Sequence, residues 1–341
     1  STRTVLGIDA STQSLSAVLL QANTGEILWS RSLAYRDDPR LAGFGFEHDT
    51  MIIPPREPGE AEQPPRLFIA ALEALFADLK AAGFDTSAIA AINTSGQQHG
   101  HVYLNDQAKA LFARLRDTAS AKDTLLSLLG DSFAYGGAPI WKTANTAAEA
   151  AHIREATGGK AAIIERTGSD IPLRFSATAH RKIAQRYPAA YSATRHIVQI
   201  SSLIPAVLAG DCAIPLDFGN ACGTALMNYR ARAWDETVRG VQGAASLRDR
   251  IGRLPPAARL PALERLLLRI TLEQPLEDRQ ALLQSARRVM CADGSVSALD
   301  RLAWLAMRHL LGGPVRLHRG GLREDNELSQ LPLAMRQAIA A

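Results

Sequence analysis

The sequence has 341 residues, of which 47% are hydrophobic and 21% are charged, so the chain can bury a sizeable core and has room for two or three domains. Its formal net charge of +4 is small for this length and its basic residues are scattered, which argues against a nucleic-acid partner. No apolar run approaches the roughly 20 residues that cross a bilayer and no secretory signal is visible, so we expect a cytoplasmic protein with no membrane partner.

The N-terminal segment predicts an antiparallel sheet. Apolar runs are separated by a polar turn and by the reversal at residues 23–26. These runs lie at residues 5–10, 16–22 and 27–35.

Helical and strand patterns then alternate. Residues 53–65 are rich in proline and charge, which predicts an exposed loop, and residues 66–82 carry the apolar face of an amphipathic helix. Residues 89–100 are interpreted as a buried strand that opens into a polar loop, and residues 101–105 as a further strand. This mixture predicts a layered α/β domain.

Helices dominate the rest of the chain. We expect one to begin after Thr143 as its cap, one over residues 177–191 with a break at Pro188, and a short one over residues 201–208. Beyond Thr237 the sequence contains no lysine and no strand-like run, and leucines recur with helical spacing. We therefore expect a small all-α domain over residues 238–341, after a first domain over residues 1–237.

Asp9 lies where the first predicted strand ends, and Ser11, Thr12 and Gln13 follow it in a turn. A carboxylate in this position can hold magnesium through water, while the amides and hydroxyls of the turn face phosphate oxygens. Because Asp-x-Ser-Thr is also a common structural turn, the residues alone leave both interpretations open.

A second group of polar residues, SGQQHGH, occupies residues 95–101. The side chains of Gln97, Gln98 and His99 offer donors and acceptors suited to a polyhydroxylated ligand. A zinc site on His99 and His101 would need a third ligand, and none is close in the sequence. The cysteines are widely spaced, so we expect neither a metal site nor a disulfide framework.

Taken together, these motifs are similar to those of a known family. GIDASTQ at residues 7–13 resembles the first phosphate motif of the FGGY carbohydrate kinases, and SGQQHG at residues 95–100 resembles the sugar-contacting loop of the xylulokinases among them. Further segments resemble family motifs in the same order, so that the resemblance covers residues 4–237. These segments are residues 138–150, 167–176 and 215–229.

The resemblance implies a first domain of the actin-like, ribonuclease H-like type that binds sugar. It also implies ATP and Mg²⁺ as cofactors and phosphorylation of a pentulose such as D-xylulose. The residues that the motif match places near phosphate and magnesium are Asp9, Ser11, Thr12 and Gln13, and those that it places near the sugar are Gln98, His99 and Arg174. The alternatives are a buried structural role for His99 and a surface ion pair for Arg174.

Some family features are not found. Thr143 and Asn220 stand where the family commonly has acids, and the Gly-Asp-Asn-like motif that carries its catalytic base is missing, as are its adenosine-binding glycine motifs. Residues 324–326 (Glu-Asp-Asn) lack the flanking glycine. We therefore assign no catalytic residue, and expect the chain to lack the second kinase domain.

The helical tail has its own signature at residues 290–303. A calcium loop is not expected there, because Val289 and Cys291 would fill ligand positions without a side-chain oxygen. The segment resembles a TerB-like helical module, and a partner chain could bind through it. Two alternatives to a kinase stay open: a non-catalytic sugar-binding or interaction protein, and a fusion or gene-model artefact near Val238.

Overall fold

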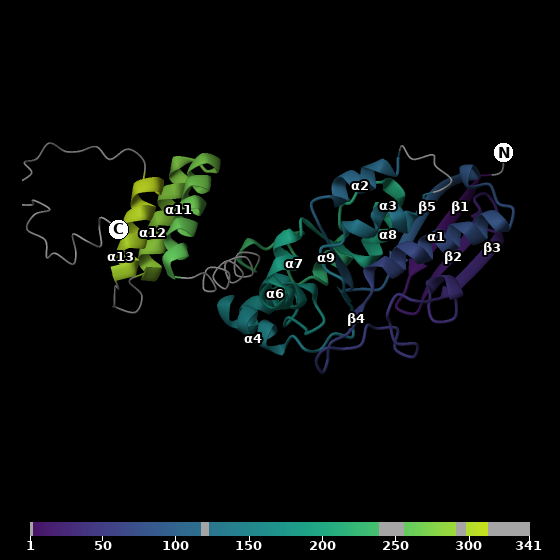
Figure 1. The fold of residues 1–341 in the computed structure, drawn as a ribbon, viewed down its shortest axis with the longest axis horizontal. Coiled ribbons are helices and arrows are strands. Elements are labelled where there is room, and N and C mark those ends of the chain that lie inside the picture. Colours follow the sequence, from purple (N-terminus) through teal and green to yellow (C-terminus); the bar gives the residue numbers. More distant parts are fainter. Residues whose placement is uncertain (1–2, 117–122, 239–255, 291–297, 313–341) are drawn as a thin grey trace, which may run out of the picture. The chain divides into compact units, whose positions relative to one another are not determined.

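The computed structural model describes residues 3–116, 123–238, 256–290 and 298–312 (Figure 1). The chain groups into two units, residues 1–250 and 251–341. The predicted boundary at residues 237 and 238 falls beside a segment outside the described residues, so it stays a prediction.

A twisted sheet with strand order β3-β2-β1-β5 forms the centre of the first unit. Its strands are β1 (Thr4–Ala10), β2 (Ser14–Gln21), β3 (Ile27–Ala34) and β5 (Ile89–Gly96). The antiparallel pairing of β1 with β2 and of β2 with β3 confirms the predicted meander. Because β5 runs parallel to β1, with Ala10 opposite Gly96, the carboxyl ends of these two strands lie at one edge.

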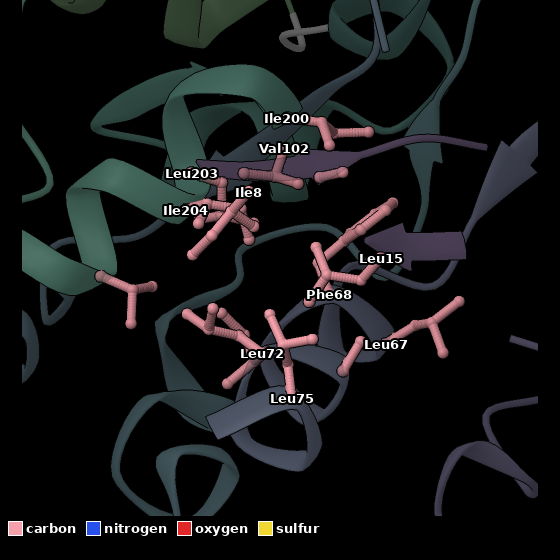
Figure 2. Close-up of a cluster of buried hydrophobic side chains, with 14 of the residues drawn as sticks. Ile8, Leu15, Leu67, Phe68, Leu72, Leu75, Val102, Ile200, Leu203 and Ile204 are labelled. Atoms are coloured by element: carbon pink, nitrogen blue, oxygen red, sulfur yellow. The ribbon is translucent and has the colours of Figure 1, made fainter. Parts of the chain in front are cut away.

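One face of the sheet packs against α1 (Pro65–Ala81) and α8 (Ile200–Ala209). Leu6, Ile8 and Ala10 of β1 alternate into this core, where Figure 2 shows Ile8 close to side chains of α8. Successive side chains of a strand point to opposite faces. Asp9 therefore lies on the face of the sheet opposite this core.

Short strand pairs and helices surround the central sheet. The pairs are β4 (Glu62–Gln63) with β7 (Ala138–Pro139), β6 (His101–Leu104) with β8 (His196–Gln199), and β9 (Met227–Asn228) with β10 (Ala233–Trp234). The other described α-helices of this unit are α2 (Ala108–Arg114), α3 (Leu125–Leu129), α4 (Ala147–Ala156), α5 (Lys160–Thr167), α6 (Ser176–Arg186), α7 (Pro188–Ala193) and α9 (Phe218–Cys222). The predicted break at Pro188 is confirmed, since α6 ends before it and α7 begins with it.

The predicted helix cap at Thr143 is wrong. Helix α4 begins after Thr146, whereas the Thr143 hydroxyl is buried and donates to the backbone oxygen of Ala61 at 2.8 Å. Tertiary hydrogen bonding therefore uses the side chain that the sequence suggested as a cap.

The proline-rich stretch at residues 53–65 is an exposed loop only in its first part. Residues 60–65 are buried, and Arg56 forms ion pairs with Glu60 at 2.8 Å and with Glu62 at 2.7 Å. The Tyr135 hydroxyl also donates to Glu62. Paired, hydrogen-bonded carboxylates can be buried at tolerable cost, which a composition rule for loops does not anticipate.

Strand β5 was predicted to be buried, and this is also wrong. Residues 90–93 are exposed, because β5 is the edge strand of the sheet. An edge strand packs on fewer neighbours than a central one, whatever its hydrophobicity.

The second unit is helical where it is described. Its described helices are α11 (Pro256–Glu273), α12 (Leu276–Met290) and α13 (Ala298–Leu311). Leu267 and Leu311 are buried, and the Thr271 hydroxyl donates to the backbone oxygen of Leu310 at 2.9 Å. Most of the candidate calcium loop, and residues 324–326, lie outside the described residues. Within the described part of the chain, no helix is both long and apolar enough to cross a membrane.

Candidate functional site

A cavity of about 590 Å³ opens at the carboxyl ends of β1 and β5. Its lining residues are Asp9, Ser11, Thr12, Gly96, Gln97, Gln98, His99, Trp141 and Arg174. Six of the seven site residues predicted from the sequence are thus brought together. The seventh, Gln13, is exposed and does not line the cavity.

Asp9 reaches this cavity because strand alternation turns it away from the core. Its carboxylate forms no hydrogen bond or ion pair with another described residue. Burial raises the pKa of the Tyr35 hydroxyl, and the nearby Asp9 charge raises that pKa further. Among the described residues, the Asp9 carboxylate therefore has no hydrogen-bond or ion-pair partner.

The turn after Asp9 is closed by Ser11. Its hydroxyl accepts the backbone N–H of Ser14 at 3.2 Å, and its own N–H donates to the Ser14 carbonyl at 2.9 Å. The Ser11 hydroxyl thus holds the turn in shape, which favours a structural contribution at this position.

A chain of hydrogen bonds fixes Thr12. The Trp141 indole N–H donates to the Thr12 hydroxyl at 2.8 Å, and this hydroxyl lies 3.3 Å from Gln97 Oε1, to which it donates. Gln97 Nε2 then donates to Gln63 Oε1 at 2.8 Å, and Gln63 Nε2 returns to the Thr12 carbonyl at 2.9 Å. Because buried Gln97 uses both ends of its amide inside the protein, exposed Gln98 is the glutamine left for a ligand.

His99 has a left-handed backbone with φ of 64°. Its Nδ1 lies 3.1 Å from the Gly223 carbonyl, and because a carbonyl only accepts, Nδ1 carries the proton. The ring also stacks on Phe175 with centroids 4.6 Å apart. Burial lowers the pKa of His99, and the positive charge of Arg174 lowers that pKa further. The imidazole is therefore neutral at pH 7, with Nε2 available as an acceptor.

Arg174 lies in the loop just before α6. The carbonyl of its neighbour Leu173 accepts hydrogen bonds from the hydroxyls of Thr178 and Thr146, which hold this loop in place. The guanidinium is exposed, and within the described part of the chain it forms no ion pair. The surface ion pair considered from the sequence is thus not found among these residues.

The two departures from the family motifs lie away from the cavity. Thr143 bonds to Ala61, and the side-chain amide of Asn220 donates to Asp217 at 2.6 Å. Neither side chain lines the cavity. The described residues contain no group of three His, Cys, Asp or Glu side chains that could hold a metal.

Sequence reasoning missed the contributions of Trp141 and Gln63. Trp141 lies in one of the motif-like segments, but nothing local indicates that its N–H reaches Thr12. Gln63 lies in the stretch that was predicted to be an exposed loop. Their hydrogen bonds join distant segments, so no spacing rule could have found them.

Comparisons with known proteins give relatives of the first unit. Residues 135–256 match the N-terminal domain of the FGGY family of carbohydrate kinases. D-xylulose kinase A of Aspergillus niger is 28% identical over 254 residues, which cover 73% of this chain and 43% of that protein. Xylulose kinase 2 of Arabidopsis thaliana is 29% identical over 253 residues, covering 74% of this chain and 43% of that protein. The first unit of the chain is therefore similar to the N-terminal domain of the FGGY carbohydrate kinases. Among these kinases the chain is similar to xylulokinases, and it spans less than half the length of these relatives.

Solved structures show the same fold. Xylulose kinase from Rhodospirillum rubrum aligns with a TM-score of 0.51 at 16% identity, covering 74% of this chain and 41% of that one. Gluconate kinase from Lactobacillus acidophilus aligns with a TM-score of 0.51 at 18% identity, covering 71% of this chain and 40% of that one. The first unit of the chain therefore has the predicted actin-like α/β fold, which does not by itself distinguish between substrates. The resemblance of the tail to a TerB-like module stays a prediction.

Proposed function

We propose that this chain is a member of the FGGY carbohydrate kinases and supplies the sugar-binding part of a xylulokinase-like enzyme that phosphorylates a pentulose such as D-xylulose with ATP. The observation that carries the proposal is the single cavity in which Asp9 and Thr12 meet His99 and Arg174. Its volume of about 590 Å³ lies within the range of small-molecule sites.

The sugar contacts follow from the free hydrogen-bonding groups. His99 Nε2 would accept a hydrogen bond from a sugar hydroxyl, whereas the Arg174 guanidinium can only donate. Gln98 can do both. Trp141 is 44% exposed and lines the cavity, so its ring offers an apolar face to the C–H groups of the sugar.

Asp9 and the turn that follows it would hold the phosphate end. Mg²⁺ in phosphoryl-transfer sites is usually bound by one or two carboxylates, with phosphate oxygens and water completing the shell. The unpartnered carboxylate of Asp9 fits this pattern. When bound, Mg²⁺ neutralises charge on the phosphates.

The described residues do not supply everything that the reaction needs. Transfer to a sugar hydroxyl requires a base within hydrogen-bonding distance of that hydroxyl, and Asp9 is the only carboxylate among the residues that line the cavity. We therefore propose that the base and the adenosine-binding groups come from outside the described residues. Because the enzyme would use cellular ATP, the proposal includes a cytoplasmic location.

The cavity that brings Asp9 and Thr12 together with His99 and Arg174 also favours a second candidate function, a sugar-binding protein without catalysis. An assay of the pure chain with ATP and Mg²⁺ over a panel of pentuloses, polyols and aldonates, combined with calorimetry, separates these functions. We expect sugar binding without turnover. Mg²⁺-dependent turnover of D-xylulose that Asp9→Asn abolishes would show that the chain is a complete kinase, and a lack of binding across the panel would refute the sugar site.

A further inference from the structure

Two buried side chains, His101 and Tyr103, hold the main chain at His99, where the loop after β5 lines the cavity. His101 is 1% exposed and Tyr103 is fully buried. His101 Nδ1 lies 2.8 Å from the backbone oxygen of His99, and His101 Nε2 lies 3.0 Å from the Tyr103 hydroxyl. Hydrogen bonds thus run without a break from the Tyr103 hydroxyl through the His101 ring to the backbone oxygen of His99, which lines the cavity.

The direction of each hydrogen bond follows from its chemistry. The His99 carbonyl can only accept, so the His101 proton resides on Nδ1. In a neutral ring Nε2 is then the acceptor, and the Tyr103 hydroxyl must be its donor. The Tyr103 hydroxyl therefore selects the one tautomer of His101 that can hold the His99 carbonyl.

The surroundings of His101 keep it neutral. The His180 ring meets it edge to face with centroids 4.7 Å apart, and none of its hydrogen-bond partners among the described residues is charged. Burial lowers the pKa of His101 to about 4 and lowers the pKa of His180 well below its usual value. At neutral pH the tautomer is therefore set by hydrogen bonding alone.

His99 needs this support because its backbone conformation is unfavourable. A residue other than glycine with positive φ costs on the order of 1 kcal/mol and persists only where the surroundings impose it. In this conformation the His99 ring stacks on Phe175 and donates to Gly223, which leaves Nε2 for a ligand. Free rotation of the His99 peptide would remove that alignment.

We propose that His101 is a positioning residue for the sugar site: its Nδ1–H, held in that tautomer by Tyr103, locks the His99 main chain so that His99 Nε2 is presented to a sugar hydroxyl. This inference rests on the proposed function, because it assumes that a sugar binds beside His99. It assigns a role to two buried residues that do not line the cavity.

Two amide substitutions of His101 distinguish a role in positioning His99 from a role in packing alone. In His101→Asn the side-chain amide nitrogen can occupy the place of Nδ1, whereas in His101→Gln it reaches the place of Nε2. In the full-length chain we expect His101→Asn to keep sugar affinity within about threefold and His101→Gln to lose roughly 3- to 10-fold, the loss of one hydrogen bond. His180→Asn is the matched control, because His180 packs on the same ring and its Nε2 has no partner. It should leave affinity unchanged.

A measurement without sugar keeps the inference testable if the proposed function fails. Nitrogen-15 NMR of the wild-type histidine rings should show His99 and His101 neutral at pH 7, each protonated at Nδ1. The His99 signals should be retained in His101→Asn and should change in His101→Gln. An Nε2-protonated His101, or unchanged His99 signals in both variants, would overturn the positioning role. Normal ring signals without any sugar binding would instead refute the sugar site alone, and if His101→Gln does not fold, the wild-type tautomer and His101→Asn decide.

Discussion

Trp141 donates its indole N–H to the hydroxyl of Thr12 at 2.8 Å, although 129 positions separate the two residues in the chain. The contact ties the turn after β1 to the segment that follows β7. Both residues line the cavity, so this hydrogen bond lies at its wall.

Replacing Trp141 with phenylalanine should weaken ligand binding more than stability. Trp141→Phe keeps an aromatic face but loses the donor to Thr12, which typically costs about 0.5–1.5 kcal/mol. We expect sugar affinity to fall by about 2- to 12-fold in calorimetry, while the urea midpoint changes little because the side chain is partly exposed. Unchanged affinity would show that Thr12 is fixed without Trp141.

The neighbouring glutamines Gln97 and Gln98 should respond differently to the same change. Gln97→Leu leaves Gln63 Oε1 buried without its donor, a loss that costs about 1–3 kcal/mol of unfolding free energy. Gln98→Leu removes an exposed amide and should stay within about 0.5 kcal/mol of wild type. Urea unfolding of the two variants tests this. Equal destabilisation would contradict the buried hydrogen-bond chain.

The stability of the first unit should fall as the pH is lowered from 6.5. An unfolded histidine titrates near pH 6.5, whereas the pKa of His101 in the folded chain is about 4. As the pH falls, the unfolded state therefore takes up a proton before the folded state does. Each such histidine lowers the free energy of unfolding by up to about 1.4 kcal/mol per pH unit between pH 6.5 and about 4. The raised pKa of Glu62, which results from burial, acts in the opposite direction.

Comparison with His101→Asn isolates this contribution of His101. The variant should lose less stability than wild type between pH 6.5 and 4, as measured by urea midpoints at each pH. Parallel pH profiles for the two proteins would mean that His101 already accepts a proton in the folded state.

Gly96 should not tolerate a methyl group. A Cβ there would lie 2.8 Å from Ser201 Cα and 3.2 Å from the Ala10 carbonyl, both of which are backbone atoms. Overpacking of this kind costs about 1–3 kcal/mol, so Gly96→Ala should lower the thermal midpoint and distort the cavity edge. Gly136→Ala is the control, since nothing lies within 4 Å of a Cβ at that position. A smaller effect at Gly96 than at Gly136 would contradict the close approach of α8 to β5.

Much of the fold follows from local periodicity. Alternation in β1 places Leu6, Ile8 and Ala10 in the core and turns Asp9 to the other face, because a strand has a side-chain period of two. The helical pattern predicted over residues 66–82 corresponds to α1 at Pro65–Ala81, since a strong apolar stripe has to be buried. Such features need no knowledge of distant residues.

The motifs also indicated which side chains would gather at one site. Residues 95–100 form the end of β5 and the loop after it, and the parallel pairing of β5 with β1 places them beside Asp9. Sequence reasoning did not predict which of Gln97 and Gln98 is buried. It also did not predict that Ser11 closes its own turn.

Only the tertiary structure decided the hydrogen-bond partners. Trp141 reaches Thr12, Gln63 reaches Gln97, and His101 holds the His99 carbonyl, yet none of these pairs except the last is close in sequence. Periodicity records which face of an element is apolar, whereas a polar partner depends on where the chain returns after long excursions. The same reason explains why residues 60–65 are buried despite their composition: Arg56 and Tyr135 satisfy the carboxylate of Glu62 only once the chain has folded.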